Sequence, residues 1–329
     1  MGFMKNNKIF ALISVAVLLL SGCNDANTSS SSDSQSIQTD TSNTATSDTA
    51  TSASDTSSTS GGTSASDSSS DQPINSYYDD ISITATGLSL QTSLRSLVTT
   101  THTTETTYDG LREVFKTSDA DPNNRGKIIW FYTGTSVTFS SFGGSNGDTN
   151  REHVWPKDAG KAFPETSKAG SDAHHLRPTE TQINSIRGNK SFDIVPQTSA
   201  NIAKQNGSTT YATGDYLSYT DSTFFYPGKG FRGQTARILF YVQLRWGQAY
   251  NLRFVLGSGS SKTIGDIETL MQWHLEEPAS ETELTRNEVV YGIQGNRNPF
   301  IDVPNYACRI YANDGQSYNS KVAGVCNSF

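Results

Sequence analysis

The composition of this 329-residue chain changes abruptly near residue 75, and that change limits where a fold can form. Residues 24–75 consist almost wholly of Ser, Thr, Asp, Ala and Gly, with no Lys, Arg or aromatic residue. Such a segment cannot bury enough apolar surface to offset the conformational entropy that ordering would cost. We therefore expect residues 23–75 to be a flexible tether and residues 76–329 to form one domain, a length at the upper end for a single core.

The first 23 residues have the pattern of an export signal. Lys5 and Lys8 precede an uncharged apolar run, residues 9–20, that is too short to span a bilayer and typical of a secretory signal. The run ends in Leu20-Ser21-Gly22-Cys23, which resembles the lipobox of bacterial lipoproteins. The resemblance implies removal of residues 1–22, acylation of Cys23 and anchoring to a bacterial membrane outside the cytoplasm. An ordinary signal peptide with a chance cysteine is the alternative.

The charge of the chain is concentrated outside the expected domain. Seven of the 32 acidic residues lie in the tether and two of the 25 basic residues precede it, which leaves the domain nearly neutral. Near neutrality neither favours nor excludes a polyanionic substrate, because phosphate binding depends on the local field. Residues 151–190 are weakly basic, with seven Lys and Arg against five acidic residues.

Two cysteines remain in the expected domain, Cys308 and Cys326. An even pair in an exported chain favours a disulfide, which would hold the C-terminal tail. A metal pair would need further ligands nearby, and the stretch between the two cysteines contains no His.

Apolar spacing predicts an α+β fold, in which a mostly helical domain surrounds a small sheet. A strand pair is expected over residues 127–132 and 136–142, followed by a glycine-rich loop and a strand that ends before Pro156. Thr179 and Gln182 suggest a capping box for a short helix over residues 180–187, with Gly188 at its C-cap. The other expected helices cover residues 90–98, 108–115, 235–246, 263–274 and 280–292.

Glu152, His153 and Asn184 are the candidate chemical groups. Carboxylate and amide oxygens are hard ligands that suit Mg²⁺, and a neutral His can accept a proton from an attacking water. Neighbouring residues of a strand point to opposite faces. Glu152 and His153 can therefore serve one phosphate only if the strand bulges or ends between Arg151 and Pro156.

Four runs of residues carry a resemblance to the bacterial endonuclease I family. They are Asn150-Arg151-Glu152-His153-Val154-Trp155-Pro156, Asp172-Ala173-His174-His175-Leu176-Arg177-Pro178-Thr179, Asn184-Ser185-Ile186-Arg187-Gly188-Asn189 and Gln294-Gly295-Asn296-Arg297-Asn298-Pro299-Phe300-Ile301-Asp302. The match extends from about Tyr77 to Tyr311 and covers almost the whole expected domain.

The resemblance implies a ββα-metal, or His-Me finger, nuclease site. His153 would be the general base, and Glu152 and Asn184 would bind one Mg²⁺, for which Mn²⁺ or Ca²⁺ could substitute. The family cleaves nucleic acid with little sequence preference and generally leaves a 5′-phosphate, which makes DNA the expected substrate and leaves RNA open as another. An arginine usually contacts the scissile phosphate, and Arg177 is the first candidate and Arg187 the second. We expect a monomer.

Other polar residues of these runs have competing interpretations. Asp172 could orient His153 or be a solvated loop acid. Adjacent histidines on an extended segment face opposite ways, so His174 and His175 are expected to lie one beneath the site and one near the phosphate, rather than to bind one zinc. Asn189 is placed at the cleft. For Arg297, structural hydrogen bonding is favoured over contact with a flanking phosphate.

Two other functions remain as alternatives. A zinc hydrolase would need His153, His174 and His175 to converge, and no His-Glu-x-x-His helix supports it. A surface lipoprotein that binds nucleic acid without cleaving it would show tight, salt-sensitive binding and no hydrolysis.

Overall fold

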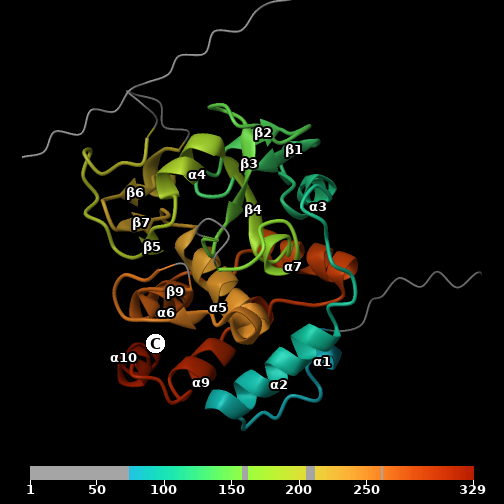
Figure 1. Cartoon of the computed structure of the whole chain (residues 1–329), viewed down its shortest axis with the longest axis vertical. Helices are drawn as coiled ribbons and strands as arrows, with labels where there is room; N and C mark the ends of the chain where they lie inside the picture. Colours follow the sequence, from blue (N-terminus) through green and yellow to red (C-terminus); the bar gives the residue numbers. More distant parts are fainter. Residues whose placement is uncertain (1–73, 158–161, 205–211, 261) are drawn as a thin grey trace, which may run out of the picture. The chain divides into compact units, whose positions relative to one another are not determined.

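Helices provide most of the regular structure, as the apolar spacing predicts (Figure 1). The computed structural model describes residues 74–157, 162–204, 212–260 and 262–329. The expected signal segment, Cys23 and nearly all of the tether lie outside these residues, so the boundaries at residues 22 and 75 stay predictions. Within the described part, no helix combines the length and apolar character needed to cross a membrane.

The helices are α1 (Ile74–Tyr77), α2 (Gly87–Thr100), α3 (Leu111–Ser118), α4 (Thr181–Arg187), α5 (Arg232–Tyr250), α6 (Ile267–Glu276), α7 (Glu281–Gln294), α8 (Pro299–Asp302), α9 (Tyr306–Tyr311) and α10 (Asn319–Cys326). The strands are β1 (Lys127–Ile129), β2 (Ser136–Thr138), β3 (Thr149–His153), β4 (Leu176–Glu180), β5 (Ser191–Phe192), β6 (Tyr219–Thr220), β7 (Phe224–Tyr226), β8 (Arg253–Phe254) and β9 (Thr263–Ile264). The α+β class is confirmed.

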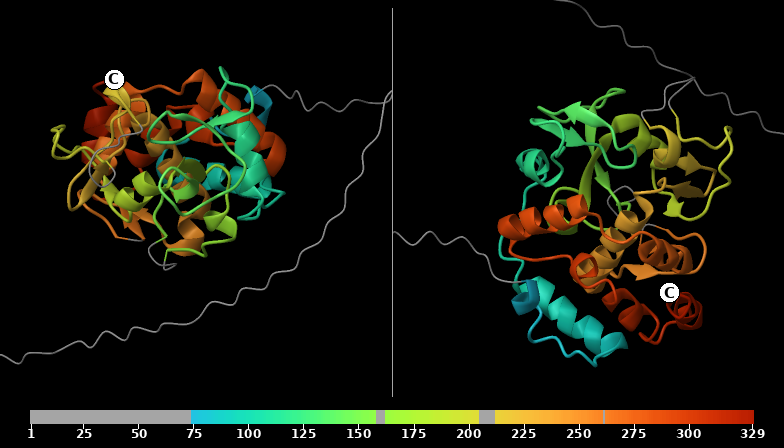
Figure 2. Two further views of the ribbon diagram at one scale, coloured as in Figure 1. Left: turned by 90° about the horizontal axis from the view of Figure 1, so that it is seen from above. Right: turned by 180° about the vertical axis from the view of Figure 1, so that it is seen from behind.

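Helix α5 forms the centre of the larger hydrophobic core. Its residues are buried on every side from Thr235 to Val242, as expected of a helix that is covered all round. It packs against α2, α6 and α8. In Figures 1 and 2, α5 lies between the sheets formed by β1 to β7 at one end and α2, α9 and α10 at the other. The predicted Cys308–Cys326 disulfide joins α9 to α10, with the two Cα atoms 5.8 Å apart.

Strands β3 and β4 and helix α4 form a ββα unit. The two strands pair antiparallel without a bulge, from Thr149 opposite Glu180 to His153 opposite Leu176. Strand β4 was not predicted from the sequence, which suggested an irregular loop up to Leu176. It leads directly into α4, which ends at Gly188 with a positive φ of 55°, as predicted.

One predicted helix cap and one predicted helix start are wrong. The Thr179 hydroxyl donates to the Phe131 carbonyl, and Glu180 caps α4 instead by accepting from the Ile183 N–H. Helix α6 begins at Ile267 because Thr263 belongs to β9 and the Asp266 carboxylate caps the helix. The predicted cap of α7 is confirmed, since the Ser280 hydroxyl accepts from the Glu283 N–H.

Candidate active site

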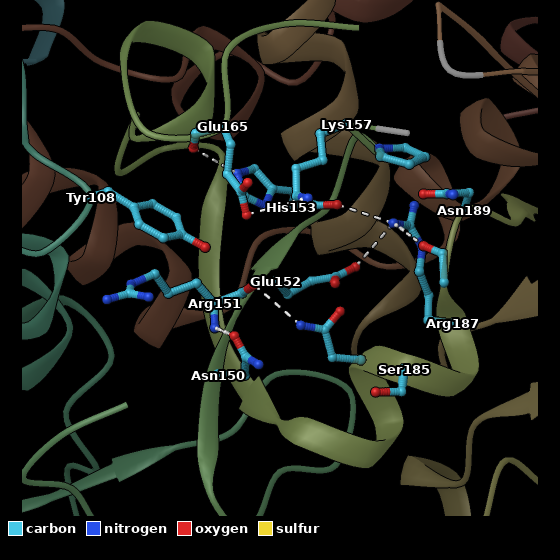
Figure 3. A pocket seen from close by; sticks show the side chains of 13 residues that line it. Tyr108, Asn150, Arg151, Glu152, His153, Lys157, Glu165, Ser185, Arg187 and Asn189 are labelled. Carbon is cyan, nitrogen blue, oxygen red and sulfur yellow. Dashed lines mark hydrogen bonds and ion pairs between the residues drawn. The ribbon is translucent and has the colours of Figure 1, made fainter. Parts of the chain in front are cut away.

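A cavity of about 380 Å³ opens where β3 meets α4 (Figure 3). It brings together the Glu152, His153 and Asn184 of the sequence analysis. The residues that line it are Tyr108, Asn150, Arg151, Glu152, His153, Pro156, Lys157, Glu165, Asn184, Ser185, Arg187, Gly188 and Asn189.

The end of β3 explains how adjacent side chains reach one cavity. Along the strand, Arg151 and His153 share one face and Glu152 points to the other. Helix α4 approaches the strand beside them, where the Asn184 side-chain amide donates to the Arg151 carbonyl at 3.2 Å. The ladder with β4 ends at His153, so the cavity wraps around the strand end and receives side chains from both faces. The strand therefore ends where the sequence required, and it needs no bulge.

Glu152 is a buried carboxylate, 1% exposed. Burial raises its pKa, whereas the Arg187 guanidinium and the Tyr132 hydroxyl oppose that rise. The hydroxyl donates to Oε1 at 2.8 Å, and Arg187 Nη1 lies 3.3 Å from the same oxygen. No partner for the other oxygen, Oε2, is found among the described residues, so Oε2 remains available to a cation in the cavity.

His153 is held through one of its two ring nitrogens. Nε2 lies 3.0 Å from the Gly170 carbonyl oxygen and 3.3 Å from that of Glu165. Carbonyl oxygens only accept, so Nε2 carries the proton and Nδ1 has the lone pair. Burial and the nearby His175 lower the pKa of His153 to about 3, which keeps the ring neutral at pH 7.

Gly170 is needed for this contact with His153. A Cβ at position 170 would overlap the backbone oxygens of Pro164 and Glu165. Because Gly170 has no side chain, its backbone can approach closely enough for its carbonyl oxygen to accept a hydrogen bond from the Nε2–H of His153.

Arg187 is part of the cavity lining, although its side chain is only 1% exposed. Its Nη1 donates to the His153 carbonyl at 3.0 Å and its Nη2 to the Val154 carbonyl at 2.6 Å. Together with the ion pair to Glu152, these bonds fix the backbone that follows β3. Arg187 therefore uses its guanidinium to hold other residues of the site in place.

The oxygen groups fit a hard divalent ion. The Asn184 amide nitrogen is used in the bond to Arg151, which directs its carbonyl oxygen elsewhere, and Glu152 Oε2 is available. The described residues contain no group of three or more His, Cys, Asp or Glu side chains that could hold a metal. Two protein oxygens and several waters suit Mg²⁺ better than zinc, which usually takes at least three protein ligands.

The three histidines of the zinc alternative do not converge. His175 lies beneath His153, with ring centroids 5.6 Å apart, and its own nitrogens bind the Ala169 carbonyl and the Trp155 N–H. The Nε2 of His174 points instead to the Asn296 carbonyl at 2.9 Å. One of the two histidines, His175, thus lies under the site as expected, whereas neither lines the cavity in the way expected of a residue near the phosphate.

Both interpretations of Asp172 from the sequence are wrong. Asp172 does not contact His153 and so does not orient it, and it is buried and so is not a solvated loop acid. Its carboxylate, 1% exposed, accepts from the Tyr241 hydroxyl and the Trp246 indole, each at 2.8 Å, and from the Gln294 amide at 3.0 Å. Burial raises its pKa, but His102, His174 and the hydrogen bonds from Gln294 and Trp246 outweigh that effect and hold the pKa well below its usual range. Asp172 therefore links α5 and α7 beneath the site.

The structure places Arg177 and Arg297 away from the cavity lining. Arg177 donates to the buried Asp119 at 2.9 Å. Arg297 forms ion pairs with Glu288 and Asp302, as the favoured structural interpretation predicts. Asn189 lines the cavity.

Three residues of the lining were not singled out from the sequence. Tyr108 stacks near His153, with ring centroids 5.9 Å apart, and Lys157 pairs with Glu165 at 3.2 Å. Lys157 directly follows the motif around His153, which was the one available signal. Tyr108 is the first residue of the helix expected over residues 108–115, and nothing in its spacing pointed to the site.

Comparison with known proteins decides the family, because residues 86–305 match the model of the family described as Endonuclease I. The chain belongs to the endonuclease I family. It is also 36% identical over 243 residues to a protein of Bacillus amyloliquefaciens named extracellular ribonuclease, covering 71% of this chain and 78% of that protein. A Bacillus subtilis (strain 168) protein of the same name is 36% identical over 232 residues, covering 69% and 75%. The chain is therefore a nuclease that hydrolyses phosphodiester bonds, with the ββα-metal fold of its family.

Proposed function

We propose that this endonuclease I family member works outside the cytoplasm, requires a divalent metal, and hydrolyses both DNA and RNA with His153 as its general base. The observation that carries the proposal is the fixed tautomer of His153 beside the oxygens of Glu152 and Asn184. It places a neutral nitrogen lone pair and two hard ligands in one cavity.

His153 would take the proton of the attacking water through Nδ1. Its Nε2–H stays on the Gly170 carbonyl, so the ring keeps its orientation as Nδ1 gains a proton. The low pKa of about 3 keeps the ring unprotonated before substrate binds. A polyanionic strand in the cavity stabilises the imidazolium and raises that pKa toward a value suited to proton transfer.

Glu152 and Asn184 would hold one Mg²⁺, which when bound stabilises negative charge on the leaving oxygen. Mn²⁺ or Ca²⁺ has the same oxygen preference and could occupy the position. Arg187 opposes the rise that burial causes in the pKa of Glu152 and is a positioning residue. Lys157, which lines the same cavity as His153, is the cation that we assign to the scissile phosphate.

Attack by water needs no 2′-hydroxyl on the substrate. The mechanism therefore applies equally to RNA, the substrate in the names of both relatives, and to DNA. It leaves a 5′-phosphate on one product and a 3′-hydroxyl on the other. An RNase that used the 2′-hydroxyl as nucleophile would instead give a cyclic phosphate and would leave DNA intact.

The location outside the cytoplasm is supported by the names of the two relatives and by the N-terminal signal pattern. Acylation of Cys23 would hold the domain at a membrane surface through the tether, within reach of extracellular nucleic acid.

The test uses purified protein with plasmid DNA, single-stranded DNA and RNA, each with Mg²⁺ or with EDTA. We expect chelator-sensitive cleavage of all three, and a loss of about 10²- to 10⁴-fold for His153→Ala. Arg112→Met, an exposed substitution on α3, serves as a control for expression and folding. Cleavage that persists in EDTA, a cyclic phosphate product, or near-normal activity of His153→Ala would refute the mechanism.

A further inference from the structure

Arg151 has unusual surroundings for a cation at the edge of an active site. Its guanidinium carbon lies 4.0 Å from the centre of the Tyr108 ring and 3.7 Å from that of Phe142. Aromatic faces attract and orient a guanidinium, so these two rings keep the plane of the group fixed. The side chain is 14% exposed.

The hydrogen bonds of Arg151 differ from those of Arg187. Its Nη2 donates to Asp109 at 3.2 Å, and the Asp109 side chain is 98% exposed. An ion pair with such an exposed partner contributes only about 0–1 kcal/mol. The Nε of Arg151 is buried and has no hydrogen-bond partner in the described structure. Arg187, in contrast, is held by backbone carbonyls and by Glu152.

The position of Arg151 points to a phosphate other than the scissile one. Arg151 and His153 are two residues apart on one strand face, a separation of about 6.6 Å along the chain. Figure 3 shows the Arg151 guanidinium and Tyr108 at one end of the cavity and Arg187 and Asn189 at the other, with Glu152 between them. A strand that places one phosphate at His153 therefore extends over Arg151.

We propose that Arg151 binds the phosphate next to the scissile phosphate, and that this phosphate replaces the Asp109 carboxylate on the guanidinium. The inference rests on the proposed function. Tyr108 positions Arg151 and, since it also stacks near His153, links this subsite to the base. The Asp109 carboxylate forms an ion pair with the Arg151 guanidinium when no substrate is present, and it competes with the phosphate for that guanidinium.

Substitutions of Arg151 and of Asp109 should change KM in opposite directions. Arg151→Gln removes a charged donor to a phosphate and should raise KM by about 10- to 100-fold with little change in kcat. Asp109→Asn removes the competing carboxylate and should lower KM at low salt. Loss of one phosphate contact also reduces the salt dependence of binding to a single strand by about 0.7 in the log–log slope.

The decisive experiment varies the neighbouring phosphate. Trinucleotides carry one ordinary phosphodiester, and the adjacent linkage, on the 5′ or the 3′ side, is either a charged phosphorothioate or an uncharged methylphosphonate. Wild-type protein should cleave the charged form better on one of the two sides, and Arg151→Gln should abolish that preference. Arg151→Lys should retain part of it, because the charge remains.

Several results would overturn the inference. They are an equal loss of kcat for Arg151→Gln on every substrate, no loss on any, or a preference for the charged linkage over the methylphosphonate that survives the substitution. If wild-type protein cleaves no trinucleotide, polynucleotide or plasmid, the proposed function fails instead. The two failures are therefore distinguishable.

Discussion

Replacing Arg187 with Met tests whether this arginine supports the site or acts on substrate. Met has a similar length and is apolar, so it fills most of the space but provides no donor. The substitution removes the bonds to the carbonyls of His153 and Val154 and the ion pair with Glu152, all of them buried. Glu152 is then a buried carboxylate whose remaining donor is Tyr132.

The expected loss is large because one partner of a buried ion pair is removed and the other remains. Such changes cost about 3–5 kcal/mol of stability. In a domain of this size each kcal/mol lowers Tm by about 2–4 °C, so the expected decrease is about 10 °C. The pKa of Glu152 should also rise, because the Arg187 charge that opposes the effect of burial is gone. Mg²⁺ affinity should fall as a consequence.

Thermal unfolding followed by circular dichroism measures the first effect, and the Mg²⁺ concentration at half-maximal activity measures the second. Arg112→Met is the control, since that side chain is 51% exposed and its substitution should change stability by less than about 0.5 kcal/mol. A variant of Arg187 that kept its Tm and its Mg²⁺ requirement but lost kcat would refute the positioning role. It would favour direct contact of Arg187 with the phosphate.

Two further predictions concern buried groups. Tyr132→Phe removes the hydroxyl donor to Glu152, so the acid limb of the pH–activity profile should move to higher pH and the Mg²⁺ requirement should rise about 10-fold, as measured by steady-state assays. Burial and Arg237 lower the pKa of His274 to about 4. Between pH 6.5, the approximate pKa in the unfolded chain, and pH 4, His274 is protonated in the unfolded chain but not in the folded protein. The free energy of unfolding therefore decreases as the pH is lowered through this range, by up to about 3 kcal/mol. Denaturant titrations of His274→Gln should show a loss of stability at low pH that is smaller than in the wild type by about this amount, and an unchanged dependence of stability on pH would contradict the prediction.

The positions of the proposed site residues at element ends could be predicted from local signals, whereas their roles were implied by the resemblance to the endonuclease I family. Pro156 and the glycine-rich loop place the end of the strand beside Glu152 and His153. Gly188 marks the end of the helix that carries Asn184. Where a strand or helix ends depends on the backbone preferences of a few neighbouring residues, and those preferences can be read from the sequence.

The partners of the buried charges could not be predicted in this way. Asp172 binds side chains from α5 and α7, which follow it by 69 to 122 residues, and Arg177 pairs with Asp119, 58 residues before it. Strand β4 was missed because all five of its residues are buried and show no alternation of polar and apolar side chains. Long-range packing decides these features, and local periodicity contains no record of it.

The contact between His153 and the Gly170 carbonyl has an evolutionary consequence. The proton on the imidazole is directed by main-chain oxygens, which every residue type possesses, so point mutation of a partner side chain cannot remove them. The constraint on sequence change therefore falls on position 170 itself, because the glycine there tolerates no Cβ. Selection can remodel the surroundings of the cavity for new substrates and leave the tautomer of its base intact.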